Sequence, residues 1–459
     1  MRAWQAECVE KAIAHYRHSS HFFCQATPGS GKTRMAAEIA RQLLSADKVD
    51  LVLCFAPSCQ VVDRLRITFA NVLGRRLDGL IGAVGSASTY QGMDHRDERF
   101  WALLDQYRVL TVFDEIHHCA GHDSLLSNAW GQTILQRIQD RAEFTLALSG
   151  TPWRSDEKPI ALARYSNPEG RLICDYRYGL QEAIADGVCR SPRIVLLDNS
   201  SVKLTEHSDN DAQVTVYPSI AELLTDSPIT FEDLLTHNEI INQVIELGCQ
   251  KLDEIRRAIP NAGGLLVATS IHHANQIATV LVSLGETFEV VTNRTPNAQV
   301  IIDEFRNGGC RWIVAVGLIS EGTDIPRLQV CCYLSRIRTE LHYRQVLGRV
   351  LRRIGVGDDQ AWLYVLAEPT LQQFSERVAK DLPEELAVIK YVSPSRTDIN
   401  LTDDVVGPDD DRFPFEKPLG RQSPRPTEDE RLSLGLMQDE RLYTLEMSSN
   451  FRTEILAIY

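Results

Sequence analysis

Apolar and polar positions along the chain fall into short, continuously apolar runs separated by longer stretches with helical periodicity. Runs typical of buried strands lie at 21–25, 51–56, 109–113 and 144–148, and a second series lies at 264–269, 288–292, 312–317, 329–334 and 361–366. The stretch from Arg34 to Leu44 is an example of the amphipathic helices expected between them. Short buried strands that alternate with helices are typical of parallel sheets. The pattern therefore predicts an α/β protein with two successive parallel-sheet domains.

Two segments interrupt this pattern. The first, 199–245, is acidic and has clusters of Asn, Asp, Ser and Thr, which are typical of a linker or insertion. The second, 412–427, contains four prolines and is followed by a helix-like stretch at 428–447. We therefore expect a first sheet domain at 1–190, an acidic linker or insertion at 191–250, a second sheet domain at 251–370 and a partly irregular C-terminal extension at 371–459.

Composition narrows the class of protein. The 459 residues are 44% hydrophobic, which is enough for two or three ordinary cores, but no apolar run is long enough to cross a bilayer. The first residues lack the basic and then apolar pattern of an export leader. The eleven cysteines include no Cys-x-x-Cys pair, so free thiols in a reducing compartment are favoured over a zinc ribbon. We expect a cytoplasmic protein with no membrane partner.

The net charge of −14 argues at first against a polyanionic ligand. Its distribution weakens that argument, because residues 199–245 hold eight acidic side chains and one lysine, and residues 396–459 hold fourteen acidic and eight basic ones. The rest of the chain is then close to neutral, so a local basic groove remains possible. The acidic segments are expected to be solvated surface, with shielding of a groove or docking of a basic partner as the alternative.

A phosphate-binding loop is predicted at residues 26–33, Ala-Thr-Pro-Gly-Ser-Gly-Lys-Thr. The loop follows an apolar run and precedes an amphipathic helix, which is the context that such loops require. Two glycines let the backbone N–H groups turn toward phosphate oxygens, and the helix N-terminus adds positive potential. Lys32 supplies a mobile positive charge, and the Thr33 hydroxyl can bind Mg²⁺. Ala26 stands where the usual pattern has its first glycine.

Two carboxylates follow a strand at the same kind of position. The run 109–113 ends directly in Asp114 and Glu115, and open α/β sheets bind their ligands at the carboxyl ends of their strands. Asp114 could hold Mg²⁺, and Glu115 could accept a proton from an attacking water. His117 and His118 could suggest zinc instead, but no other His or Cys pair has matching spacing, so zinc is disfavoured.

Together these residues resemble the superfamily 2 helicases and translocases, specifically the DExH branch, and other motifs match in order along 1–368. Ser-Gly-Thr-Pro-Trp-Arg at 149–154 resembles motif III, 317–326 resembles motif V, and Gln-Val-Leu-Gly-Arg-Val-Leu-Arg-Arg at 345–353 matches motif VI. Arg2-Ala-Trp-Gln5 resembles the adenine-reading element, and 56–58 and 88–91 resemble motifs Ia and Ib. The double histidine and the form of motif V are most similar to restriction-subunit and XPB-type duplex translocases.

The resemblance implies two tandem RecA-like domains with an ATP cleft between them, and ATP and Mg²⁺ as cofactors. It implies catalytic roles for Glu115, Asp114, Lys32, Arg349, Arg352 and Gln345, with the two arginines, three apart on a presumed helix, acting as arginine fingers. Nucleotide-binding roles are implied for Gln5, Thr27, Pro28, Gly29, Ser30, Gly31, Lys32, Thr33, Gly322 and Asp324. Thr33 and Asp114 would be the Mg²⁺ ligands, and His117 and Gln345 would link the two sides of the cleft.

The resemblance also implies a nucleic-acid partner, with DNA preferred to RNA. The implied contacts are Pro57, Ser58, Thr89, Gln91, Trp153, Arg154, Ser270 and Arg294. Core packing is an equal alternative for Trp153, and a surface loop is an equal alternative for the segment that contains Arg294. The expected function is an ATP-dependent DNA helicase or translocase. An RNA helicase and a motor subunit that works only with a protein partner are the alternatives.

Overall fold

The structure is a computed structural model, and it describes residues 1–121, 128–152, 154, 158–167, 170–208, 211–317, 325–355, 357–380, 442–448 and 451–457. Two mixed α/β assemblies with largely parallel sheets make up most of this part of the chain. The predicted α/β class is confirmed. Within the described residues, no helix is both long enough and apolar enough for a membrane span.

Six strands of the described chain form the first sheet, in the order β3-β2-β4-β5-β1-β8, and all neighbouring pairs are parallel. The strands are β1 (His21–Ala26), β2 (Leu51–Ala56), β3 (Gly85–Thr89), β4 (Val109–Asp114), β5 (Phe144–Ser149) and β8 (Tyr176–Tyr178). The four strands predicted in this half are confirmed. Because the strands are parallel, the loops that follow β1 to β5 all leave from one edge of the sheet.

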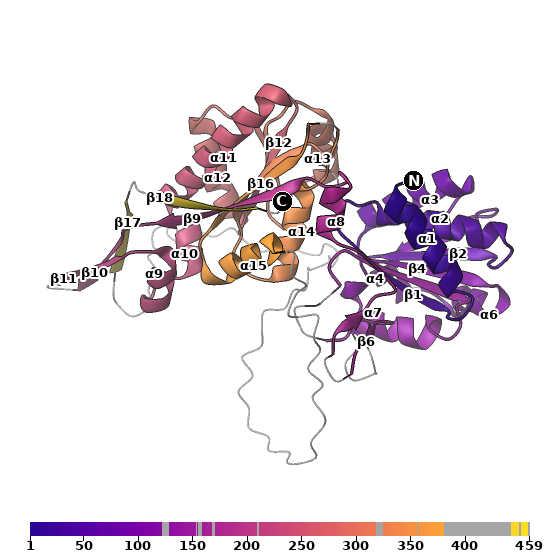
Figure 1. Cartoon of the computed structure of the whole chain (residues 1–459). Coiled ribbons are helices and arrows are strands. Elements are labelled where there is room, and N and C mark those ends of the chain that lie inside the picture. Colours follow the sequence, from indigo (N-terminus) through magenta and orange to yellow (C-terminus); the bar gives the residue numbers. More distant parts are fainter. Residues whose placement is uncertain are drawn as a thin grey trace, which may run out of the picture. The chain divides into compact units, whose positions relative to one another are not determined.

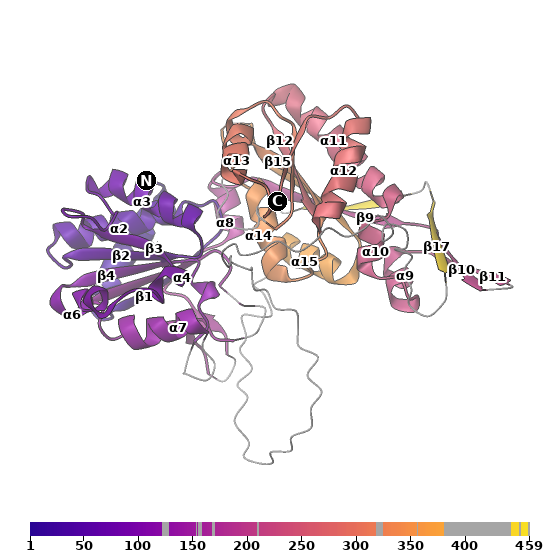
Figure 2. The same ribbon diagram turned by 180° about the vertical axis from the view of Figure 1, so that it is seen from behind.

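Alternate side chains of the first sheet face two layers of helices. Phe22 lies 5.5 Å from the ring of His15 on one face, whereas Phe23 belongs to a buried cluster with Ile134 and Ile138 on the other. Accordingly, α2 and α3 cover one face and α7 the opposite face in both views (Figures 1 and 2). The remaining elements here are α1 (Ala3–His15), α2 (Lys32–Ser45), α3 (Cys59–Leu73), α4 (Tyr90–Met93), α5 (Glu98–Trp101), α6 (Leu103–Gln106), η1 (Ile116–His118), α7 (Ala129–Thr133), η2 (Ile134–Ile138), β6 (Arg164–Tyr165), β7 (Leu172–Ile173) and α8 (Leu180–Ala185).

Seven described strands form the second sheet, in the order β13-β14-β12-β15-β16-β9-β18. Only β18 is antiparallel to its neighbour among them. The strands are β9 (Ser191–Asn199), β12 (Gly263–Ala268), β13 (Phe288–Val291), β14 (Trp312–Ala315), β15 (Leu328–Leu334), β16 (Gln360–Leu366) and β18 (Phe451–Ala457). All five strands predicted in this half are confirmed.

Helices also cover both faces of the second sheet. On β15, the Cys332 Sγ lies 3.7 Å from the Val244 carbonyl oxygen of α11, whereas the next residue, Tyr333, packs against Tyr343 of α14. Figures 1 and 2 show α11 and α12 on one side and α14 and α15 on the other. The helices are α9 (Ile220–Asp226), α10 (Phe231–Leu235), α11 (Asn238–Ala258), α12 (Ile271–Ser283), α13 (Ala298–Asn307), α14 (Glu340–Val350) and α15 (Pro369–Ala379).

The segment expected to be an acidic linker, 191–250, is built differently. Its first residues form β9, in which Ile194, Val195, Leu196 and Leu197 are all buried, so it supplies a strand to the second sheet. The next part of the segment, where the acidic stretch begins, forms β10 (Val202–Ser208) and β11 (Asp211–Tyr217). The apolar run in β9 explains the difference, because a strand inside a sheet whose two faces are covered buries the side chains on both of them. The limits proposed for the two sheet domains stay predictions.

The end of the chain also differs from the expectation. Residues 442–447, expected within a helix, form strand β17 (Leu442–Met447), which joins β11 and β10 in a separate three-stranded sheet. Pairing with β10 satisfies the backbone of this segment, and such long-range pairing overrides local helical preference. The proline-rich stretch and the rest of the predicted helix lie outside the described residues. The β10–β11 hairpin and β17 form a small compact unit distinct from the one that holds both large sheets.

Gly264→Ala is expected to destabilise the second sheet. A Cβ at this position in β12 would lie 2.1 Å from the indole of the fully buried Trp312. Over-packing of this kind costs about 1–3 kcal/mol. Urea unfolding should show the loss, whereas Gly309→Ala, where the new Cβ would meet nothing within 4 Å, should leave the unfolding midpoint nearly unchanged. Equal midpoints for the two variants would contradict this packing.

Candidate nucleotide site

The predicted phosphate loop connects β1 to α2 through two glycines with positive φ. Gly29 has φ +82° and Gly31 has φ +96°, a region that residues with a Cβ rarely adopt. The Lys32 side chain turns back over the loop, and its Nζ donates to the Ala26 carbonyl oxygen at 3.1 Å. The loop therefore has the left-handed backbone turns and the placed cation that a phosphate group needs.

The lysine of this loop contacts Glu115, the residue directly after β4 that is predicted to activate water. Lys32 Nζ lies 3.4 Å from Glu115 Oε1, and Glu115 Oε2 accepts the Gly150 N–H at 3.1 Å. The sheet order β4-β5-β1 explains this meeting, because Glu115, Gly150 and Lys32 follow three neighbouring strands at one edge. Glu115 itself has φ +52°, a strained backbone for a non-glycine residue that often marks a functional position.

Asp114, the last residue of β4, is a buried carboxyl group with an incomplete hydrogen-bond set. Burial raises its pKa to about 7, the negative charge of Glu115 adds to the rise, and the positive charge of Lys32 opposes it. Its Oδ1 has no hydrogen-bond partner among the described residues. A divalent cation would provide the missing partner and favour the ionised carboxylate. The residues present thus fit Mg²⁺, with Asp114 and the half-buried Thr33 as the ligands available.

The His117 side chain contacts both Glu115, directly after β4, and the residues at the end of β5. Its Nδ1 lies 2.9 Å from Ser149 Oγ and 3.5 Å from Glu115 Oε2, and Ser149 Oγ also accepts the Thr151 N–H. Arg154 donates to the His117 carbonyl oxygen at 2.6 Å. The residues that follow β4 and the segment that resembles motif III therefore form one hydrogen-bonded group. No set of three or more potential metal-binding side chains gathers anywhere in the described residues.

Gln5 lies against the phosphate loop and is almost completely buried. Its Nε2 donates to the Gly31 carbonyl oxygen at 2.9 Å, and its Oε1 accepts the Arg2 N–H at 2.8 Å. The Arg2 guanidinium donates to the Ser30 carbonyl oxygen at 2.5 Å. Each end of an amide can make a second hydrogen bond, so this arrangement still permits adenine recognition. That role for Gln5 stays a prediction.

One motif VI arginine lies at the phosphate loop. A Cβ built on Gly29 would lie 3.0 Å from Arg352 Cγ, and one built on Gly348 would lie 2.9 Å from Pro28 Cβ. Burial lowers the pKa of Arg352 to about 10, and the positive charge of Arg64 adds to this effect. A cationic group held at a phosphate loop in this way is suited to an anionic ligand.

The two arginines do not share a helix, as the sequence analysis presumed. Helix α14 contains Gln345 and Arg349 but ends at Val350, and Arg352 lies beyond it in a bridge with Cys189. The backbone of Arg352 pairs with that of Cys189 instead of continuing the hydrogen bonds of α14. Gly322, Asp324 and Trp153 lie outside the described residues.

The described residues among those predicted to contact nucleic acid lie at or after the ends of strands, at the carboxyl edges of their sheets. Three of the hydroxyls cap helices, since those of Ser58, Thr89 and Ser270 accept N–H groups of α3, α4 and α12. Gln91 and Arg294 are exposed, and Pro57 is half-buried. Arg154 is used within the site, as described above, and the nucleic-acid contacts remain predictions.

Sequence reasoning missed three features of this site and its surroundings. The N–H of Gly150 holds the Glu115 carboxylate, although the sequence showed only its place within a motif. Arg190, which is fully buried, binds the backbone at the end of α14. No signal in the sequence marks Arg190, because its partners are mostly backbone carbonyl groups. The strain at Glu115 was likewise visible only in the structure.

This fold and site define a phosphate-loop protein with two RecA-like assemblies in tandem. Comparisons with known families agree: "Type III restriction enzyme, res subunit" matches residues 1–154, and "Helicase conserved C-terminal domain" matches residues 250–354. The chain belongs to superfamily 2 of the helicases and translocases, in the branch of the restriction subunits and XPB. The family predicted from the sequence is therefore confirmed.

Individual relatives extend over most of the chain. An uncharacterized protein of Mycobacterium tuberculosis H37Rv is 31% identical over 82% of this chain and 62% of its own length. The DNA 3'-5' translocase XPB2 of Sulfurisphaera tokodaii is 24% identical over 77% of this chain and 79% of its own. The chain thus spans about three fifths of the mycobacterial relative.

A solved structure supports the fold. The fragment structure of a putative HsdR subunit of a type I restriction enzyme from Vibrio vulnificus YJ016 aligns with a TM-score of 0.56. The alignment covers 82% of this chain and 65% of that one, at 16% sequence identity. At this identity the likeness concerns the fold, and it agrees with the tandem RecA-like arrangement.

Proposed function

We propose that this chain hydrolyses ATP with Mg²⁺ and uses the reaction to move along or unwind DNA. One observation carries the proposal: Lys32, Glu115 and Arg352 come from different parts of the chain and meet at the phosphate loop. Phosphoryl transfer depends mainly on positioning and charge stabilisation, which this arrangement supplies. The proposal includes a cytoplasmic location, where ATP and nucleic acid are both at hand.

Each group would have its own task in hydrolysis. The backbone N–H groups of the loop and Lys32 would hold the phosphates, while Arg349 and Arg352 would stabilise charge that develops in the transition state. Glu115, already oriented by Gly150 and Lys32, would accept a proton from the attacking water. Mg²⁺ bound by Asp114 and Thr33 would neutralise phosphate charge.

The hydrogen bonds around Glu115 suggest how hydrolysis would reach the nucleic acid. Glu115 contacts Gly150, and His117 contacts Ser149. A movement of Glu115 on hydrolysis would therefore displace the residues at the end of β5. The predicted DNA contacts at Ser58 and Thr89 follow β2 and β3 at the same edge of the same sheet. A movement of the loops at this edge would change their contacts with the DNA strand. Gln345, on α14, is proposed to take part in the same response.

Two observations favour DNA over RNA. The relative from Sulfurisphaera is named as a DNA translocase, and the family that matches residues 1–154 is a restriction-enzyme subunit. The mycobacterial relative is longer than the part that this chain matches. We therefore also propose that this ATPase works with a further domain, either in the same chain or in a partner subunit. That part of the proposal would be tested by isolating the native complex and measuring its mass.

The test is ATP turnover by the purified chain without polymer and with single-stranded DNA, duplex DNA or RNA. Each measurement is made at low and moderate salt, because phosphate contacts weaken as salt rises. We expect DNA to raise the turnover rate strongly, and less so at the higher salt. Stimulation by RNA alone would overturn the DNA assignment. A rate that no polymer changes would show that the isolated chain is not a nucleic-acid motor.

A further inference from the structure

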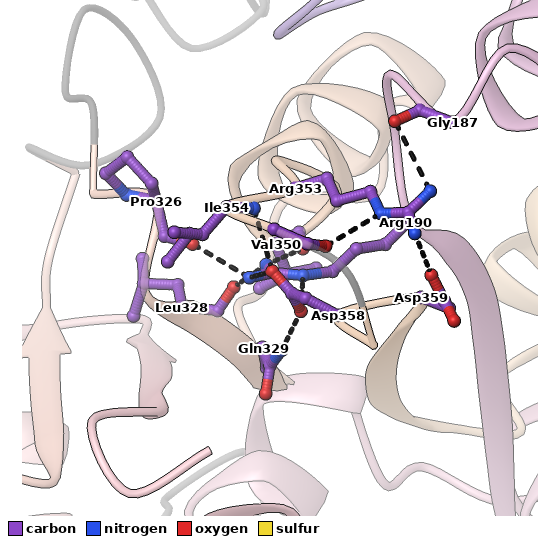
Figure 3. A network of polar contacts seen from close by, with 11 residues as sticks. Gly187, Arg190, Pro326, Leu328, Gln329, Val350, Arg353, Ile354, Asp358 and Asp359 are labelled. Atoms are coloured by element: carbon purple, nitrogen blue, oxygen red, sulfur yellow. Dashed lines mark hydrogen bonds and ion pairs between the residues drawn. The ribbon is translucent and has the colours of Figure 1, made fainter. Parts of the chain in front are cut away.

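Arg190 forms a buried polar network outside the nucleotide site (Figure 3). It lies directly before β9 and is fully buried. Its Nε and Nη2 donate to the two carboxylate oxygens of Asp358 at 2.6 and 2.7 Å, which is a two-pronged ion pair. Asp358 is buried as well, and it also accepts the Ile354 N–H at 2.9 Å and the Gln329 amide.

The remaining donors of Arg190 bind backbone carbonyl groups of two other segments. Nη1 donates to Val350 at 2.7 Å and to Leu328, and Nη2 donates to Pro326 at 2.9 Å. All five N–H donors of the guanidinium are thereby used. Val350 is the last residue of α14, where helix carbonyl groups lack partners within the helix. Arg190 thus caps the helix that carries Arg349.

The same short segment reaches the phosphate loop. The Arg190 backbone N–H donates to the Leu351 carbonyl oxygen at 2.8 Å, and Cys189 forms a bridge with Arg352. Cys189 Sγ in turn lies 3.8 Å from the Pro28 carbonyl oxygen of the loop. Arg353 is turned away from the loop, since it donates to the Gly187 and Gly355 carbonyl oxygens and pairs with Asp359. Residues 187–190 therefore lie between the loop and the end of α14.

We propose that Arg190 is a positioning residue, which fixes the end of α14 so that Arg349 and Arg352 face the phosphate loop. It acts through Val350, Leu351 and Asp358 and touches no reacting atom. The inference rests on the proposed ATP hydrolysis. Arg190→Lys keeps one positive charge beside Asp358, but a compact ammonium group has only three donors and cannot reproduce the planar fork. The end of α14 would then lose some of the hydrogen bonds that fix its position.

Arg327→Lys is the matched control. Arg327 is also buried and donates to three backbone carbonyl oxygens, those of Asn261, Phe305 and Cys310, at 2.7 to 2.8 Å. It lies between two residues whose carbonyl groups Arg190 binds, so it controls for general loosening of that segment. None of these three residues belongs to α14.

The experiment compares both variants with the full-length wild type. We expect Arg190→Lys to lower kcat by about 10- to 100-fold with little change in the ATP dissociation constant, because misplaced catalytic groups cost rate rather than binding. We expect Arg327→Lys to change kcat less than about twofold at a similar loss of melting temperature. Binding of ADP with aluminium fluoride, which imitates the transferring phosphoryl group, supplies a readout without turnover. Arg190→Lys should lose the preference for this complex over ADP, and Arg327→Lys should keep it.

The outcomes separate the inference from the proposed function. Equal effects of the two substitutions in an active protein would overturn the inference alone. A wild type that neither hydrolyses ATP nor prefers the aluminium fluoride complex would overturn the proposed function, and the inference with it. If Arg190→Lys fails to fold, Asp358→Asn tests the same ion pair from the other partner, because the amide keeps only one of the two oxygens that Arg190 binds. A folded Asp358→Asn with wild-type kcat and analogue preference would then count against the inference.

Discussion

Replacing Glu115 with glutamine is expected to lower ATP turnover by about 10²- to 10⁴-fold, which is the usual contribution of a general base. Glutamine keeps the shape of the side chain and an oxygen that can accept the Gly150 N–H, which Glu115 Oε2 now accepts at 3.1 Å. It cannot accept a proton from water. Nucleotide affinity should therefore be retained, because Lys32 and the loop backbone remain. Steady-state turnover and equilibrium binding of ATP measure the two quantities separately.

Glu143→Gln is the control for Glu115→Gln, since Glu143 is exposed and lies directly before β5 of the same sheet. It should leave turnover unchanged. Loss of ATP binding in Glu115→Gln would show that the carboxylate builds the site rather than activating water. Wild-type turnover in that variant would remove Glu115 from the mechanism.

Replacing Lys32 with methionine is expected to lower turnover by about 10²- to 10³-fold and also to weaken binding of Mg²⁺–ATP. Methionine fills similar space without the charge. Lys32 Nζ lies 3.4 Å from Glu115 Oε1 and opposes the raised pKa of Asp114. Its removal would take away the proposed phosphate contact and make ionisation of Asp114 harder, so both turnover and binding should suffer. This dual loss distinguishes Lys32→Met from Glu115→Gln.

Arg34→Met provides the comparison for Lys32→Met. Arg34 also lies in the first turn of α2, but it is exposed, so its loss removes a nearby positive charge without altering the loop. We expect turnover and binding close to those of the wild type. If Arg34→Met impaired both quantities as much as Lys32→Met, general electrostatic attraction would explain the result better than a specific phosphate contact.

The central part of the fold was predictable from the sequence because buried parallel strands are continuous apolar runs. The runs at 51–56 and 109–113 became β2 and β4, and in β4 every residue is buried. The phosphate loop was predictable for a related reason. Its glycines, lysine and flanking elements are all local in sequence, so no long-range pairing had to be known.

Features that depend on distant partners were not predictable in this way. β9 joins the second sheet beside β16, and β18 pairs with it from the far end of the chain. The contacts of Arg190 are hidden for the same reason, since backbone carbonyl groups have no sequence signature. The end of α14 at Val350, which places Arg352 beyond the helix, follows from pairing with Cys189 rather than from helical preference.

The central claim is that hydrolysis at this site moves the chain along DNA. The most direct measurement is ATP-driven displacement of streptavidin from DNA biotinylated at one end or the other, on single strands and duplexes. The account predicts displacement that requires ATP, favours one end and disappears in Glu115→Gln. Displacement no faster than the spontaneous rate, under conditions in which DNA stimulates ATP turnover, would contradict it.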